Sequence, residues 1–176
     1  MASVTESITV NCPISTVYNQ WTQFEEFPRF MQAVEAVSQT DDTHLHWVAE
    51  IGGKRHEWDA EITEQRPDEV VSWRALDGQY NSGRVLFEKI DQARTKVTVE
   101  MEHETEGMME TLGSALGSDS RQVKGDLERF KDFIEERGRE TGGWRGMIDN
   151  PDAPGGHTMG NATPEEGERD MERRAS

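Results

Sequence analysis

The sequence predicts an α+β fold. We expect a curled, seven-stranded antiparallel sheet, two short helices after the first strand, and a long C-terminal helix across the concave face. Two observations carry this prediction. Apolar side chains recur at every second position through most of residues 33–105, which is typical of half-buried strands. Residues 118–138 instead carry one apolar stripe with spacings of four, three and four, as on one face of a helix.

The chain begins with a strand and two short helical segments. Residues 4–10 alternate between two faces, one with three apolar residues and Glu6 and the other with only Ser and Thr, which is typical of a half-buried strand. Pro13 suits a first helical turn, and four apolar residues follow it at helical spacing: Ile14, Val17, Tyr18 and Trp21. The aromatic stretch 24–31 contains Pro28, which opposes a continuous helix. We therefore expect a second short helix or turn there, with its aromatic side chains tucked inward.

Six further strands are expected at residues 34–40, 44–51, 54–65, 69–76, 80–90 and 95–105. Turn-forming pairs such as Gly52-Gly53 and Asp77-Gly78 separate them. Short connections join antiparallel neighbours, so the strands should form a meander, and a sheet of this size curls.

The alternation also assigns faces to the sheet. The outer face is acidic, as in the last strand, where Glu100, Glu102 and Glu104 alternate with inner-face residues. A bulge would exchange the two faces, because it shifts the strand by one residue. The inner face should carry Leu45, Trp47, Ala49, Ile51, His56, Trp58, Ala60, Ile62, Val71, Trp73, Ala75, Gly83, Val85, Phe87, Val97, Val99, Met101 and His103.

The long helix should run over residues 118–138, with Ser118 or Asp119 as its N-cap and Gly138 as its C-terminal stop. Its apolar stripe is Val123, Leu127, Phe130 and Ile134. After residue 140 the chain becomes polar and rich in Gly and Pro. We expect one domain over residues 1–140 and a disordered acidic tail over residues 141–176.

Composition limits the possible partners. The net charge of −16 disfavours nucleic acids and anionic membrane surfaces, since both are polyanions. A single cysteine, Cys12, allows no intrachain disulfide, and the N-terminus lacks the pattern of a signal peptide. No apolar run is long enough to span a membrane. We expect a cytoplasmic protein without membrane insertion, and the sequence leaves its oligomeric state open.

Metal and cofactor chemistry find little support. His44 and His46 share one face of a strand, while His56 is assigned to the opposite face, so three ligands do not converge. Cys12 lacks an evident base and is best interpreted as a small buried residue. The chain contains no nucleotide-binding glycine motif. We therefore expect neither a metal nor a cofactor.

The aromatic inner face is the best candidate for a binding site, because a curled sheet closed by one long helix leaves space beneath it. Candidate catalytic residues are His103, Tyr80 and Arg74; the last two are chosen from position alone. The expected ligand-binding residues are Phe27, Phe30, Trp47, Trp58, Trp73, Phe87, Met101, His103, Met108, Leu112, Leu116, Val123 and Leu127.

Three stretches resemble a known family. VYNQWTQFEEFPRFM, VVSWRALDGQYNSGRVLFE and DLERFKDFIEERG, the last followed by TGGWRG, resemble segments of bacterial polyketide cyclase/dehydrase proteins. The order of elements resembles the helix-grip fold of the START-like (SRPBCC) superfamily, which also includes lipid-transport and coenzyme-Q-binding proteins. The resemblance covers about residues 3–148.

The resemblance implies binding or carrying of a small apolar ligand, such as a lipid, an isoprenoid or quinone, or a polyketide-like molecule, between sheet and helix. One alternative is a cyclase or dehydratase acting on an aromatic or poly-keto substrate. Another is a non-catalytic stress or interaction protein. No catalytic residue can be mapped by motif, so whether the protein is an enzyme stays open at this stage.

Overall fold

The computed structural model describes residues 2–78, 81–103 and 115–149, with side chains described from residue 120 onward in the last range. The elements in chain order are β1 (Ala2–Val10), α1 (Ile14–Trp21), the 3₁₀ helix η1 (Phe24–Arg29), β2 (Val34–Gln39), β3 (His44–Ile51), β4 (Lys54–Arg66), β5 (Val70–Ala75), β6 (Asn81–Asp91), β7 (Arg94–His103), α3 (Ala115–Arg137) and β8 (Ile148–Asp149).

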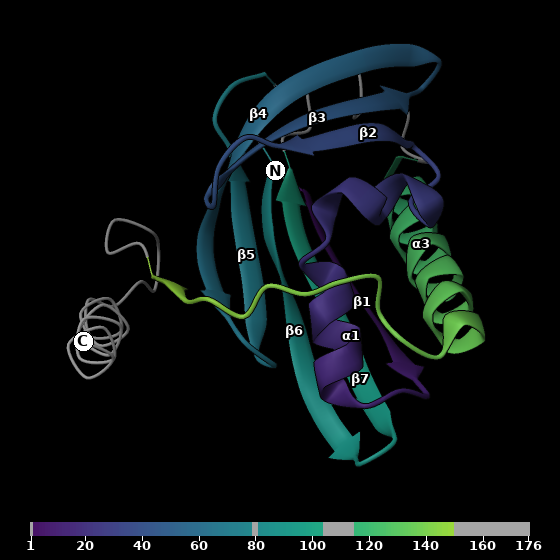
Figure 1. Cartoon of the computed structure of the whole chain (residues 1–176). Coiled ribbons are helices and arrows are strands. Elements are labelled where there is room, and N and C mark those ends of the chain that lie inside the picture. The colour runs from purple at the N-terminus through teal and green to yellow at the C-terminus, as the bar shows by residue number, and fades with distance from the viewer. Residues whose placement is uncertain (1, 79–80, 104–114, 150–176) are drawn as a thin grey trace, which may run out of the picture.

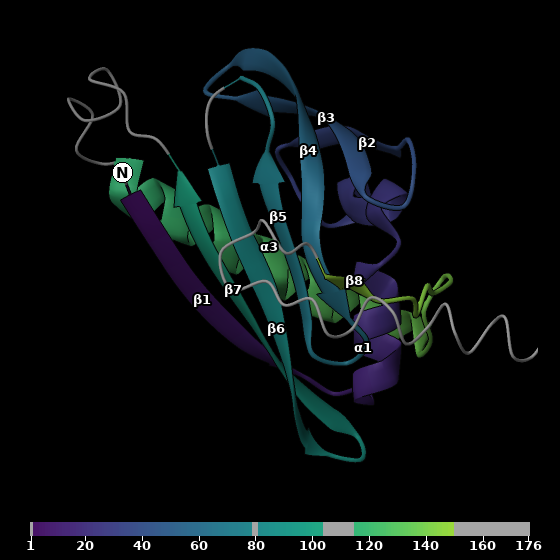
Figure 2. The same ribbon diagram turned by 90° about the vertical axis from the view of Figure 1, so that its left-hand side faces the viewer.

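The seven predicted strands form one antiparallel sheet in the order β1-β7-β6-β5-β4-β3-β2, and the short β8 pairs with β4. Strands β2 to β7 are the expected meander, and β1 returns to pair with β7 along its whole length. Figures 1 and 2 show the sheet curled, with α1, η1 and α3 all on its concave side. The predicted fold class is confirmed.

A tight hairpin joins β3 to β4. Gly52 and Gly53 have φ angles of 62° and 82°, and Ile51 pairs with Lys54 across the turn. Positive φ at both central positions matches the twist of the flanking strands, which explains the Gly-Gly pair. At this hairpin Ile51 is 51% exposed and His56 is exposed, so neither belongs to the enclosed inner face that the alternation predicts.

Aromatic side chains seal one end of the concave face. Trp21 of α1 packs against Phe27 and Phe30 of the η1 region and against Phe130 of α3, with ring centroids 5.1 to 5.8 Å apart. Most of these contacts are edge-to-face or tilted, which is the favoured geometry for aromatic pairs. The prediction that the aromatic residues around Pro28 turn inward is therefore confirmed, in the form of a 3₁₀ helix.

The long helix α3 covers the sheet with the predicted stripe. Leu127, Phe130 and Ile134 are at most 2% exposed, while Val123 is half-buried. The helix ends as expected, with Gly138 at φ 76° and its backbone N–H bonded to the Ile134 carbonyl. The predicted N-cap is wrong, because the helix already begins at Ala115. Alanine and leucine are strong helix formers, and they extend the helix by about one turn.

A bulge in β4 exchanges its two faces. Pairing with β5 shifts between Ile62 and Glu64, so Thr63 is an extra residue on β4. Unbroken alternation would have placed Gln65 on the outer face. Instead Gln65 pairs with Val71, an inner-face residue, and its side chain is 1% exposed.

Residues 139–149, here called the strap, cross back over α1 and end as β8 on β4 (Figure 1). The β3 pairing stops at Glu61, so the last part of β4 has a free edge that β8 partly covers. The chain from 141 to 149, assigned to the tail from the sequence, thus packs on the domain. Residues 150–176 lie outside the described residues, and the division after residue 140 stays a prediction.

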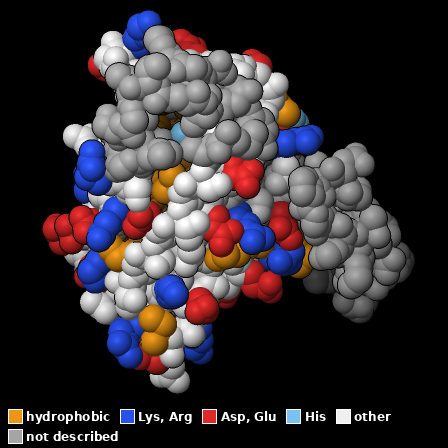
Figure 3. Space-filling view, turned by 180° about the vertical axis from the view of Figure 1, so that it is seen from behind, with side chains coloured by type: hydrophobic (Ala, Val, Ile, Leu, Met, Phe, Trp, Pro, Cys, Tyr) orange, Lys and Arg blue, Asp and Glu red, His pale blue; other side chains and the backbone are white. Residues whose placement is uncertain are grey.

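The outer face of the sheet is polar and carries both charges, as Figure 3 shows from behind. Cross-strand ion pairs join Arg84 to Glu100 at 2.7 Å and Arg74 to Glu61 at 2.9 Å. Each joins residues directly opposite in the ladder, where opposite charges stabilise strand pairing. In the part of the chain with described structure, no helix is long and apolar enough to cross a membrane.

Candidate functional site

One end of the concave face has an apolar wall that is only half-buried. Trp73 on β5, Met101 on β7 and Val123 on α3 all pack against the core, yet each keeps part of its surface accessible. Further along the same face, Val85 and Val97 are 3% and 0% exposed. The apolar surface between the sheet and the part of α3 around Val123 is therefore less completely covered than the remainder of the concave face.

Trp73 lies flat along this wall because its neighbour is a glycine. Trp73 pairs directly with Gly83, and a Cβ at Gly83 would stand only 2.8 Å from the indole ring. The indole N–H donates to the Asn81 side-chain carbonyl at 3.2 Å, which fixes the ring orientation. A side chain at position 83 would displace the indole, so this glycine shapes the wall.

A second aromatic group lies on β3 and β4. Trp47 and Trp58 are direct cross-strand partners, and their rings stack with centroids 5.9 Å apart and planes 3° apart. Phe27 of η1 packs against Trp47, with the two ring centroids 5.8 Å apart. The Trp47 indole N–H is buried and has no hydrogen-bond partner among the described residues, which leaves a polar donor within an otherwise apolar group.

Four of the predicted ligand-binding residues are completely packed. Phe27, Phe30, Phe87 and Leu127 are between 1% and 7% exposed. Phe87 packs edge-to-face on Tyr18 with ring centroids 5.3 Å apart, and the ring centroids of Phe30 and Phe130 are 5.1 Å apart. Their position in the sealed end makes them core residues in this structure, with little surface left for a ligand.

The catalytic candidates are not brought together. His103 is half-buried at the end of β7, on the same face as Met101 and opposite Asn81 in the register. Arg74 follows the inward Trp73, so it points to the outer face, where it pairs with Glu61. Tyr80, Met108 and Leu112 lie outside the described residues, as does the Leu116 side chain.

Sequence reasoning missed an acidic residue on the inner face. Glu6 belongs to the same β1 face as the buried Val4 and Val10, and the Ser120 hydroxyl of α3 donates a hydrogen bond to its carboxylate. The signal was present in the sequence, since a glutamate among apolar residues on one face of a strand requires a partner. Only the packing of α3 on β1 identifies Ser120 as that partner.

The remaining candidates have structural partners. His44 lies 2.9 Å from the Asp41 carboxylate, and His46 bonds Asp59 and Glu57, whose carboxylates raise the pKa of His46. Among the described residues no group of three or more ligating side chains could hold a metal ion. Cys12 is buried, and burial raises the pKa of its thiol, which opposes thiolate chemistry.

A curled antiparallel sheet that holds one long helix against its apolar concave face defines a helix-grip protein. The chain belongs to the polyketide cyclase / dehydrase and lipid transport family, whose sequence profile matches residues 10–132. This confirms the START-like resemblance seen in the sequence.

Individual proteins are similar to this chain in sequence or in fold. An uncharacterized 17.2 kDa protein in the melC2-rnhH intergenic region of Streptomyces lincolnensis is 52% identical over 149 residues, covering 84% of this chain and 99% of that protein. A structure from Deinococcus radiodurans is 27% identical, with a TM-score of 0.62, covering 78% of this chain and 99% of that one. The Zhui aromatase/cyclase of a Streptomyces species is 16% identical, with a TM-score of 0.67, and the match covers 81% of this chain and 99% of that one. A START superfamily protein of Mycobacterium smegmatis is 14% identical, with a TM-score of 0.56, covering 72% and 97%.

Proposed function

We propose that the protein binds or carries a small apolar ligand between the concave face of the sheet and the N-terminal part of α3. The observation that supports this function is the half-buried apolar wall of Trp73, Met101 and Val123 beside a completely sealed core. A ligand that covered this wall would remove apolar surface from water, at about 25 cal/mol for each Å². Membership of a cyclase and lipid-transport family favours a hydrophobic ligand.

The apolar wall suits several classes of hydrophobic ligand. The wall offers indole, thioether and branched aliphatic surface, which suits a lipid, a quinone or isoprenoid, or a polyketide-like ring system. Native mass spectrometry of protein purified from its own host would detect a copurifying apolar molecule. Binding assays with a quinone, a fatty acid and a polyphenol then define the ligand class. If the protein binds none of the three, the proposal is contradicted.

Val123→Trp tests the location of the ligand. The larger indole would cover the half-buried wall itself, so we expect at least a tenfold loss of affinity for the ligand that the binding assays identify, with little change in melting temperature. The measurement is isothermal titration calorimetry. Lys124→Trp is the matched control, because Lys124 is the exposed neighbour on the same helix. Equal affinity in both variants would place the ligand elsewhere.

A cyclase or dehydratase is the second candidate, and the position of His103 favours it. His103 is a titratable group on the inner face, next to Met101 and opposite Asn81. It could transfer a proton to or from a bound poly-keto chain. In His103→Ala a cyclase would lose turnover of that chain at nearly unchanged substrate affinity and melting temperature. A carrier that has no turnover would show at most a change in affinity.

A further inference from the structure

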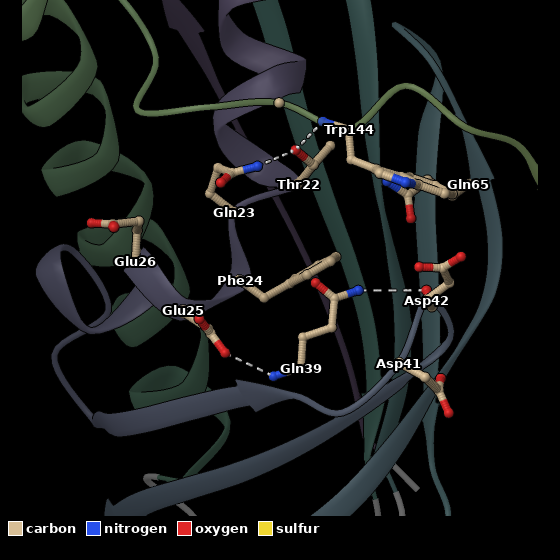
Figure 4. A pocket seen from close by; sticks show the side chains of 11 residues that line it. Thr22, Gln23, Phe24, Glu25, Glu26, Gln39, Asp41, Asp42, Gln65 and Trp144 are labelled. Atoms are coloured by element: carbon tan, nitrogen blue, oxygen red, sulfur yellow. Dashed lines mark hydrogen bonds between the residues drawn. The ribbon is translucent and has the colours of Figure 1, made fainter.

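A cavity of about 480 Å³ lies away from the apolar wall, between η1, the β2–β3 turn and the strap. Its floor is the part of β4 beyond the end of β3, where the strap crosses. Figure 4 shows side chains from all of these segments around it. The residues that define its chemistry are Phe24, Glu25, Gln39, Asp42, Gln65 and Trp144.

Gln65 is a buried polar group in the wall of this cavity, and the described residues leave it without a partner. It is 1% exposed, and neither its Nε2 nor its Oε1 atom makes a hydrogen bond. A glutamine amide can donate two hydrogen bonds and accept two, so even one bond to the nearby Tyr18 hydroxyl would leave most of this capacity unused. Burying such an amide unpaired is unfavourable, which indicates that a ligand or ordered solvent normally completes it.

Two carboxylates that line the cavity together with Gln65, those of Asp42 and Glu25, have no basic partner among the described residues. Asp42 makes no ion pair within the described part of the chain, and Glu25 accepts only the backbone N–H of Gln39, at 3.1 Å. In Figure 4 the Asp42 carboxylate and the Gln65 amide are turned toward the cavity. The other two acids at its rim are already paired: Glu26 lies 2.9 Å from Arg29, and Asp41 lies 2.9 Å from His44.

The cavity also has aromatic walls that the fold holds in place. Phe24 is 5% exposed, and the Trp144 backbone N–H donates to the Thr22 hydroxyl at 3.0 Å. Gly146 leaves room for the Trp144 ring, since a Cβ there would approach the ring to 2.3 Å. Aromatic rings offer apolar contact surface, and their faces also attract cations.

We propose that this cavity binds a small protonated amine that carries an apolar group. The ammonium group donates to Gln65 Oε1 and to the Asp42 carboxylate, and Glu25 adds negative potential. The apolar part of the ligand lies against Trp144 and Phe24. The net charge of −16 also favours the binding of a cationic ligand.

The test compares three probes of matched size: 2-phenylethylamine, 2-phenylethanol and 3-phenylpropanoate. We expect the amine to bind with a dissociation constant of about 1 mM or tighter, at least about tenfold tighter than the alcohol, and the anion not to bind measurably. Calorimetry on the whole chain at pH 7.5 gives the affinities. Equal affinity for the alcohol, or binding of the anion, would overturn the proposal.

Two variants with a matched control locate the site. Glu25→Gln combined with Asp42→Asn should weaken amine binding at least about tenfold. Asp132→Asn combined with Glu136→Gln makes the same charge change on exposed residues of α3 and should leave the affinity within about twofold. Equal losses in the two double variants would show a general charge effect and overturn the assignment.

Gln65→Leu separates binding from folding. Leucine removes the unpaired buried amide, so we expect the melting temperature to stay equal or rise by a few degrees while amine affinity falls at least about tenfold. Unchanged affinity in this variant would show that Gln65 does not face the ligand. Val123→Trp, in the separate apolar wall, should leave amine binding unchanged, and a loss there would show that the two sites are one.

Discussion

At the scale of single residues, polar groups buried beneath the strap determine the local chemistry. Tyr18 is 0% exposed, and its hydroxyl forms no well-aligned hydrogen bond with any of the described residues. The Arg145 guanidinium lies 5.4 Å above its ring and pairs with Asp68 at 2.8 Å. Burial raises the pKa of Tyr18 to about 12, although the Gln65 amide and Arg145 act to lower it.

The raised pKa predicts a loss of stability at alkaline pH. The folded state keeps the Tyr18 proton while the unfolded chain releases it near pH 10, so the stability contributed is complete below about pH 10 and is lost as pH rises toward about 12. By pH 11 the loss should be about 1 kcal/mol. Tyr18→Phe keeps the packing on Phe87 and should remove this part of the decline.

Urea unfolding of the wild type and of Tyr18→Phe at pH 8, 10 and 11 measures the effect. The difference between the two proteins cancels the titration of the other tyrosine and of the lysines. At pH 8 the variant should be at least as stable, because the buried hydroxyl that it lacks has no well-formed hydrogen bond with the described residues. Parallel pH profiles would contradict the assigned pKa.

At the scale of elements, the strap is held to α1 by close backbone contact. The Thr141 backbone N–H donates to the Gln20 side chain at 2.9 Å, and the Gln20 amide donates back to the Thr141 hydroxyl at 3.0 Å. Arg145 donates to Asn19 at 2.7 Å. The TGGWRG segment needs its glycines for this approach, since a Cβ on Gly143 would stand 2.7 to 3.0 Å from Asn19 side-chain atoms.

Gly143→Val should therefore lift the strap. We expect the unfolding free energy to fall by about 1 to 3 kcal/mol, the range for forcing extra atoms into a packed contact. Hydrogen exchange at the Thr141 and Trp144 amides should become faster, because they donate to the side chains of Gln20 in α1 and of Thr22 at its C-terminal end. Arg139→Val, an exposed position in the same segment, is the control. If both variants exchange as the wild type does, the strap does not lie against α1 as described.

Two elements, α3 and β4, differ in how well the sequence pattern predicts which side chains are buried. The stripe on α3 is predictable because Leu127, Phe130 and Ile134 follow the helical period without interruption. The face of Gln65 is not predictable in this way. One extra residue, Thr63, reverses the alternation, and nothing in the local sequence distinguishes a bulged strand from a regular one.

At the scale of the whole molecule, the two ends of the concave face differ. The end covered by α1, η1 and the C-terminal half of α3 is a sealed aromatic core, and the other end keeps a half-buried apolar wall. The proposed amine cavity lies outside this core, where the strap and the β2–β3 turn enclose the edge of β4. The proposed functions therefore occupy separate parts of one fold and can be tested independently.

The sequence by itself determined the fold class, the meander and the helix that covers the sheet, because each follows from a regular period that extends over many residues. It also identified the inner-face aromatic residues as a group. Only the tertiary structure decided which of them are sealed core, as Phe30 and Phe87 are, and which remain half-buried, as Trp73 is. It alone brought Glu6 to Ser120 and placed Gln65 beside Asp42 and Trp144. These contacts join residues far apart in the chain, and they depend on a single bulge and on the path of the strap, which no local pattern encodes.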